Sequence, residues 1–159
     1  MSTRENDARK NSLRFNGDEI VLAVDMIEMM EKIMEVVYYL MDTDGIESFV
    51  VLLMTADEID LLILLEYEKR DTDILFEVNK EKSLYVMLCQ DTKVDGGYHF
   101  AERIIKNINS KDGKDVFCAE VEVRSTRYPI KNVIFKLLEI FMKAKSENKS
   151  NEIVYKSLN

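Results

Sequence analysis

Two groups of charged side chains in the middle of the chain are the strongest candidates for chemistry. Arg70 and Asp73 form an Arg-x-x-Asp pattern. An arginine can stack on a planar ring or fork onto a phosphate, and an aspartate can accept hydrogen bonds from a bound group. A surface ion pair explains the same pattern equally well, so both interpretations stay open.

The second group is a polar segment that follows Asp73 after five intervening residues. It consists of Asn79, Lys80, Glu81, Lys82 and Ser83. Its lysines can hold phosphate as point charges. The alternative is a turn whose charges keep it soluble and unable to pair with other strands.

Apolar runs at 74–78 and 84–89 flank this polar segment. They are rich in β-branched, aromatic and aliphatic residues, which is typical of strands. The pattern therefore predicts a β-hairpin whose turn contains three charged residues and no glycine.

The remaining patterns predict the elements that must hold this hairpin. Asp18 is the expected cap of a helix over 18–42, and Thr55 and Glu58 match a capping box that opens a helix over 57–68. Further helices are expected at 99–109 and from Pro129, the latter in the first helical position. Residues 91–97 are expected to be a polar loop, and additional strands are expected at 48–54, 116–123 and 153–155.

This order predicts an α/β sandwich with a mixed sheet of about five strands, an antiparallel hairpin in the middle of the sequence and helices on both faces. The polar residues 1–15 show no periodicity and are expected to be a flexible arm. We expect residues 16–159 to form a single domain, because no linker divides them.

Composition limits the classes of partner. The chain of 159 residues is 47% hydrophobic and 33% charged, with a net charge of -8. Such an acidic surface disfavours nucleic acid and anionic membranes as partners. The chain has no long apolar run, and Cys89 and Cys118 are expected to be buried reduced thiols, so we expect a cytoplasmic protein.

The first predicted helix carries more apolar residues than one contact with a core requires. Either it is sandwiched inside the domain, or its spare face packs on another subunit. The second alternative predicts a homodimer or a docking module.

Several strings resemble the GGDEF domain of diguanylate cyclases. FVVLLM at 49–54 is similar to the first core strand of that family, AERIIKNI at 101–108 to the helix after its signature hairpin, and LLEIFMKAKSENKSNEIVY at 137–155 to its closing helix and strand. Arg70 and Asp73 match the inhibitory Arg-x-x-Asp motif of the family, which places the signature itself on 79–83. The resemblance is best over 70–155, and the N-terminal third matches only in element order.

The resemblance also implies what is missing. The family uses two glycines to bring the hairpin backbone near the nucleotide, and acids in the signature and at the end of the first strand to hold metal ions. Here Asn79 and Lys80 stand where the glycines should be, and the first strand ends at Thr55 without an aspartate. Glu81 matches the acid of the signature, but one carboxylate does not replace a metal pair. The resemblance therefore implies a chain without cyclase activity, catalytic residues, metal or cofactor.

Three hypotheses follow. The first is a non-catalytic regulatory or protein-interaction domain in bacterial signalling. The second is a cyclic di-GMP effector that uses Arg70 and Asp73, residues which the resemblance places at the product site of the family. The third is an active cyclase that uses Glu81 and Asp57, although capping and solvation explain Asp57 without a metal.

Overall fold

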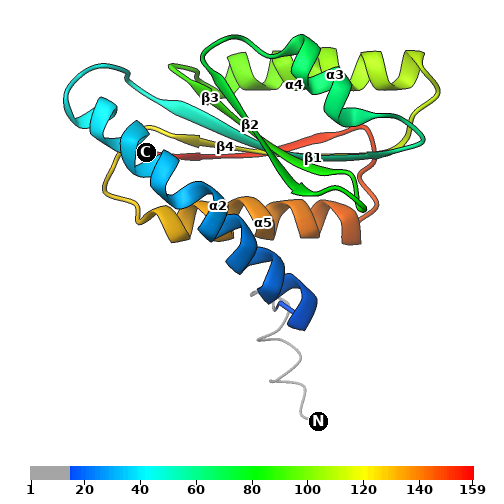
Figure 1. Cartoon of the computed structure of the whole chain (residues 1–159), viewed down its shortest axis with the longest axis horizontal. Helices are drawn as coiled ribbons and strands as arrows, with labels where there is room; N and C mark the ends of the chain where they lie inside the picture. The colour runs from blue at the N-terminus through cyan, green and yellow to red at the C-terminus, as the bar shows by residue number, and fades with distance from the viewer. Residues whose placement is uncertain (1–14) are drawn as a thin grey trace.

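The computed structural model describes residues 15–159, which contain five strands and four helices (Figure 1). The elements are α2 (Gly17–Asp42), β1 (Phe49–Asp57), α3 (Leu61–Glu68), β2 (Asp73–Asn79), β3 (Leu84–Gln90), α4 (Val94–Ser110), β4 (Lys114–Val123), α5 (Ile130–Ser146) and β5 (Ile153–Leu158). The predicted flexible arm lies outside the described residues, apart from Phe15. The ring of Phe15 stacks on Phe135 of α5 with centroids 5.6 Å apart, so Phe15 belongs to the folded domain.

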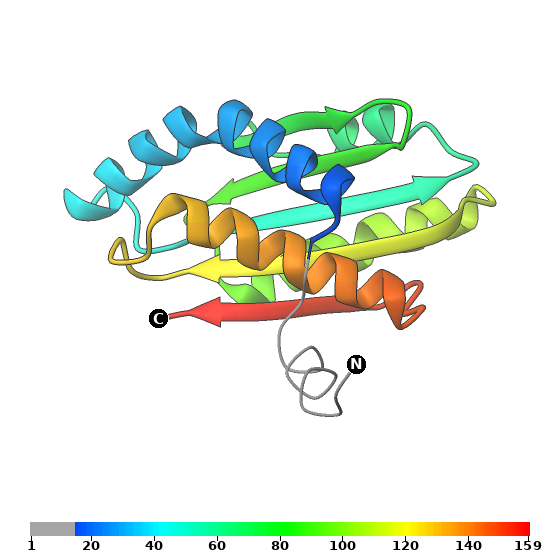
Figure 2. The ribbon, with the colours of Figure 1, turned by 90° about the horizontal axis from the view of Figure 1, so that it is seen from below.

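The five strands form one mixed sheet in the order β2-β3-β1-β4-β5 (Figure 2). β1 lies in the centre and pairs antiparallel with β3 and β4, whereas β5 pairs parallel with β4. The predicted hairpin is confirmed as β2 and β3, which pair antiparallel. Although it is central in the sequence, the hairpin forms one edge of the sheet.

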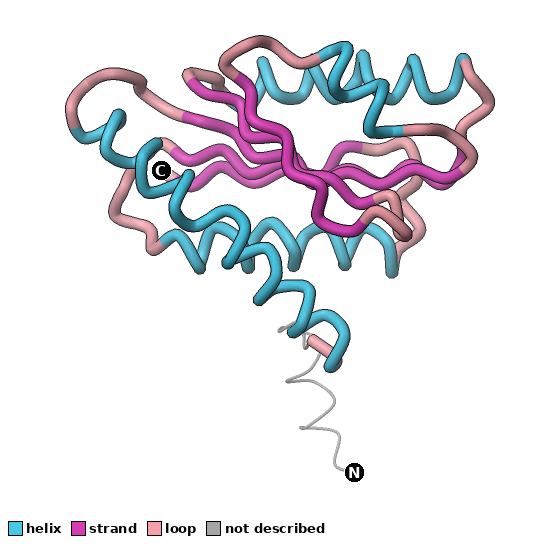
Figure 3. Tube along the Cα trace, viewed as in Figure 1, coloured by secondary structure: helices cyan, strands magenta, loops and turns pink. Residues whose placement is uncertain are grey.

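Helices cover both faces of the sheet, as Figures 1 and 3 show. α2 and α5 pack on one face, and α3 and α4 on the other. Side chains of β1 alternate between the two cores: Val51 and Leu53 face α2 and α5, and Val50 and Leu52 face α3 and α4. Burial on both faces explains why this strand is continuously apolar. The predicted α/β sandwich is confirmed.

The cap of α2 lies two residues before the position that the sequence predicted. Asn16, rather than Asp18, caps the helix: its Oδ1 accepts a hydrogen bond from the backbone N–H of Glu19 at 2.9 Å. Oε1 of Glu19 accepts in return from the backbone N–H of Asn16 at 2.8 Å. Asp18 lies in the first turn, where its charge favours the helix dipole.

The boundary between β1 and α3 was also predicted wrongly. Thr55 does not open a helix, because it still pairs with Leu84 and Phe117 in the sheet, and β1 continues to Asp57. The cap of α3 is Asp60, whose Oδ1 accepts from the backbone N–H of Ile63 at 3.3 Å. Pairing on both sides of the strand outweighs the local capping signal.

Three further element boundaries differ from the prediction. α4 begins at Val94, inside the segment 91–97 that was predicted to be a loop. Pro129 is the residue before the first turn of α5 rather than part of that turn. β5 extends to Leu158. In the described range 15–159, no helix is both long and apolar enough to span a lipid bilayer.

Candidate functional site

Arg70 and Asp73 meet directly at the start of the hairpin. The carboxylate of Asp73 accepts from Nη2 of Arg70 at 2.8 Å and from its Nε at 3.1 Å. The second carboxylate oxygen of Asp73 accepts from the backbone N–H of Arg70 at 2.8 Å. The Asp73 side chain is only 1% exposed, so its carboxylate is directed inward and used within the chain.

The guanidinium group of Arg70 has further partners on the neighbouring strand end. Its Nη2 donates to the backbone carbonyl of Gln90 at 3.1 Å and to Oγ1 of Thr92 at 2.8 Å. The hydrogen bond to Asp73 raises the pKa of Arg70, and the side chain remains 53% exposed. This arrangement fixes a cation in one orientation at the surface.

The polar segment 79–83 lies at the opposite end of the hairpin. Oδ1 of Asn79 accepts from the backbone N–H of Lys82 at 2.9 Å, and the backbone N–H of Ser83 donates to the carbonyl of Lys80 at 3.1 Å. Ser83 has a φ of 52°, which closes the turn without a glycine. Lys80, Glu81 and Lys82 are exposed. The hairpin therefore separates the two predicted groups by about 20 Å, the length of its strands.

Thr55, two residues before the end of β1, lies beside this turn. Oγ1 of Thr55 donates a hydrogen bond to the backbone carbonyl of Lys82 at 3.0 Å. Both residues line a cavity of about 500 Å³ that also includes the start of α2 and the end of α5. Among residues 15–159, no group of three or more His, Cys, Asp or Glu side chains is arranged to hold a metal ion.

Two carboxylates in β4, Glu120 and Glu122, were not singled out by the sequence. Both are buried on the face of the sheet that α4 covers. Glu122 accepts from the backbone N–H of Val94 at 2.8 Å and from the hydroxyl of Ser157. In the described part of the chain, neither carboxyl oxygen of Glu120 has a hydrogen-bond partner.

The surroundings of Glu120 favour its neutral form. Burial raises its pKa to about 8, and the negative charges of Glu122 and Asp95 add to this effect. A Cβ atom on Gly97 of α4 would overlap Oε2 of Glu120 and come within 2.8 Å of Val50. Helix α4 therefore approaches β4 so closely that only glycine fits at this position.

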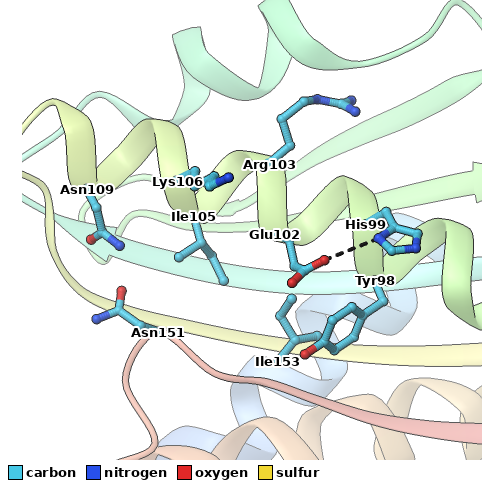
Figure 4. Close-up of a pocket in the computed structure, with 9 residues that line it drawn as sticks. All are labelled: Tyr98, His99, Glu102, Arg103, Ile105, Lys106, Asn109, Asn151 and Ile153. Carbon is cyan, nitrogen blue, oxygen red and sulfur yellow. Dashed lines mark hydrogen bonds and ion pairs between the residues drawn. The ribbon is translucent and has the colours of Figure 1, made fainter.

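A groove runs between α4 and the start of β5 (Figure 4). Its volume is about 540 Å³, and its lining includes His99, Glu102, Lys106 and Asn151. Nδ1 of His99 lies 3.2 Å from Oε1 of Glu102, and His99 is largely exposed. The groove presents side chains of both signs of charge.

The cysteines are buried and free, as predicted. Burial raises the pKa of both thiols, so both stay protonated.

Helix α2 carries most of the exposed apolar surface. In the described residues, eleven large hydrophobic side chains are exposed, and seven of them lie on α2: Ile20, Val21, Val24, Met29, Ile33, Val36 and Tyr39. The inner face of α2 contributes methionines to the core, among them Met26, Met30 and Met34. Of the two alternatives that the sequence left open, the helix sandwiched inside the domain is therefore wrong, and α2 has a spare apolar face on the outside of the domain.

No protein-family model and no curated protein matches the sequence. Solved structures do match. The GGEEF domain of a diguanylate cyclase from Vibrio cholerae is similar with a TM-score of 0.61 and 12% identity, over 78% of this chain and 92% of that one. The GGDEF domain of DgcB from Caulobacter crescentus, in complex with c-di-GMP, gives a TM-score of 0.64 and 7% identity, over 80% and 88% of the two chains.

A third similar structure is the diguanylate cyclase SiaD from Pseudomonas aeruginosa in complex with its activator SiaC. Its TM-score is 0.62 and its identity 10%, over 81% of this chain and 57% of that one. At these identities the likeness establishes architecture. The chain has the fold of the GGDEF domains of diguanylate cyclases, and its sequence is 7% to 12% identical to those of these three structures.

Proposed function

We propose that this chain is a non-catalytic domain of the GGDEF fold that acts through protein contacts made by α2. The observation that carries the proposal is the concentration of exposed apolar side chains on this one helix. Exposed apolar surface that the fold does not need is typical of interaction sites. A similar structure, SiaD, was solved with a protein activator, and protein contact is thus compatible with this fold.

The chemistry of the hairpin turn supports the absence of catalysis. Phosphoryl transfer depends on metal ions and on close positioning of phosphates. Thr55 lies two residues before the end of β1, and its hydroxyl is already bonded to Lys82. Asp57, the last residue of the strand, is exposed and belongs to no group of three or more side chains among residues 15–159 that could hold a metal ion. Asn79 and Lys80 add side chains where the resembled family has glycines.

A product assay tests the catalytic part of the proposal. The purified chain is incubated with GTP and Mg²⁺, and nucleotide products are separated by chromatography. We expect no cyclic dinucleotide above the level of a heat-denatured control. Formation of product that disappears in Glu81→Ala would overturn the proposal and favour an active cyclase.

A second candidate function is binding of cyclic di-GMP through Arg70. It is favoured by the half-exposed guanidinium, which Asp73 and Thr92 hold in one orientation. Such a group can stack on a base or bind phosphate. The DgcB domain, which has the same fold, was solved with this ligand.

Titration calorimetry with cyclic di-GMP separates this candidate from the first. Binding should vanish in Arg70→Ala and persist in Arg103→Ala, because Arg103 is equally exposed, at 54%, on another part of the surface. Absence of heat at high micromolar ligand would remove the candidate.

A further inference from the structure

We infer that the partner of α2 is a second copy of this chain, docked antiparallel along the outer ridge of the helix. This inference rests on the proposed function, since it names the partner of the same surface. The outer ridge consists of Asp18, Val21, Asp25, Met29, Lys32, Val36 and Tyr39.

The spacing of these residues places them on one stripe. Successive members are three or four positions apart, which is the 3.5-residue repeat of helices that pack along their length. The stripe lies opposite the buried face of α2, which includes Ala23, Met30 and Val37. Its apolar members are open to solvent, with Val21 and Val36 each 60% exposed.

The order of residue types along the ridge is self-complementary. If two copies of α2 run antiparallel with the twofold axis between Glu28 and Met29, Val21 meets Val36 of the partner subunit. Asp25 then meets Lys32 of the partner subunit, and Asp18 meets the hydroxyl of Tyr39 of the partner subunit. Each pair occurs twice, as an isologous interface requires.

Charge decides between antiparallel and parallel docking. α2 contains seven acidic residues and a single basic residue, Lys32. A parallel pair would place Asp25 beside Asp25 of the partner subunit, whereas the antiparallel pair places each Lys32 beside an aspartate. Opposite charges at such flanking positions favour one orientation over the other.

The helix is also long enough for such an interface. Its 26 residues span about 39 Å at 1.5 Å per residue, and no other helix or strand of residues 15–159 lies on its outer side in Figure 2. A strip along this length buries on the order of 600 Å² a side, near the low end of stable interfaces. We therefore expect a reversible dimer rather than an obligate one.

Sedimentation equilibrium of the full chain tests the dimer and its contacts. Val36→Asp should raise the dimer dissociation constant about 100-fold, since one substitution alters two symmetric contacts worth roughly tenfold each. Ile63→Asp is the matched control, because Ile63 is 64% exposed on α3, on the other face of the sheet. Lys32→Glu should weaken the dimer, and the double variant Asp25→Lys/Lys32→Glu should restore it.

Disulfide trapping tests the orientation. Val21→Cys and Val36→Cys chains are mixed and oxidised in air with copper phenanthroline, and the buried native thiols should not compete. The antiparallel dimer yields the mixed 21–36 disulfide, and each variant alone yields little. A chain that stays monomeric at high micromolar concentration, or that forms 21–21 and 36–36 disulfides instead, overturns this inference. Neither result bears on the proposed absence of cyclase activity, which the GTP assay tests separately.

Discussion

The two helical layers depart from the usual distribution of polar and apolar groups in opposite directions. The layer of α2 and α5 has an apolar core, yet α2 exposes large side chains such as Val21, Val36 and Tyr39. The layer of α3 and α4 instead covers the buried carboxylates of Glu120 and Glu122. One layer thus carries apolar groups outside, and the other carries acidic groups inside.

The difference shows which layer is constrained by folding and which is free for contacts. Buried polar groups restrict their neighbours, because each must be accommodated sterically and electrostatically. Exposed apolar groups restrict little within the domain. We therefore expect substitutions inside the α4 layer to change stability, and those on the outside of α2 to change association.

The largest effect is expected at Gly97. In Gly97→Ala the added methyl group overlaps the carboxyl of Glu120 and crowds Val50, which should lower the free energy of unfolding by about 3 kcal/mol. Gly96→Ala is the matched control: its methyl group meets only the side chain of Thr92, at 3.3 Å, and alanine favours the helix. Urea unfolding compares the two variants. Equal stability of the two variants would mean that α4 does not approach Glu120 closely at position 97.

The next effect concerns the pH dependence caused by Glu120. Its folded-state pKa of about 8 lies above the ordinary value of 4.5, so the folded chain keeps a proton that the unfolded chain loses. Its stabilising contribution is complete below pH 4.5 and declines as the pH rises toward 8 and beyond. Glu120→Gln cannot titrate and should remove about 2.5 kcal/mol of this decline between pH 5 and pH 7. Urea unfolding at both pH values measures how the free energy of unfolding changes with pH in the parent chain and in Glu120→Gln. An identical change in the two proteins would contradict a buried neutral carboxyl at Glu120.

The smallest effect is expected in the α2 layer, where Tyr38 turns a polar group inward. Its hydroxyl donates to the carbonyl of Tyr128 at 2.7 Å, and burial raises the pKa of Tyr38 to about 12. Tyr38→Phe should cost about 1 kcal/mol, the typical value of one hydrogen bond. Tyr39→Phe, on the exposed neighbour, should leave thermal stability unchanged. A loss in Tyr39→Phe as large as in Tyr38→Phe would mean that the two sides of α2 do not differ.

The hairpin and the order of elements could be predicted from the sequence, because their signals are local. Two strand-like runs around a polar turn predict β2 and β3 without knowledge of the rest of the chain. Arg70 and Asp73 form the ion pair that was one of the two interpretations of their spacing, since this spacing lets the carboxylate cap the turn and meet the guanidinium. Whether they bind a ligand stays a prediction.

The buried carboxylates could not be predicted, because their burial depends on distant packing. In β4, Glu120 and Glu122 alternate with Ala119 and Val121, a pattern that normally indicates one solvated face. α4 covers that face, and it does so with Gly97, a residue whose type argues against a helix in the sequence. The same long-range packing extends β1 past Thr55, against a local capping signal.

The central position of β1 also has a kinetic consequence. Phe49 pairs with Gln90 on one side and Val123 on the other, across roughly 40 and 75 residues of chain. β2 and β3 need only a short loop to meet, so they can pair long before β1 finds its neighbours. We expect the hairpin to fold first and the insertion of β1 to limit the folding rate, with the slow phase set by closure of these long loops.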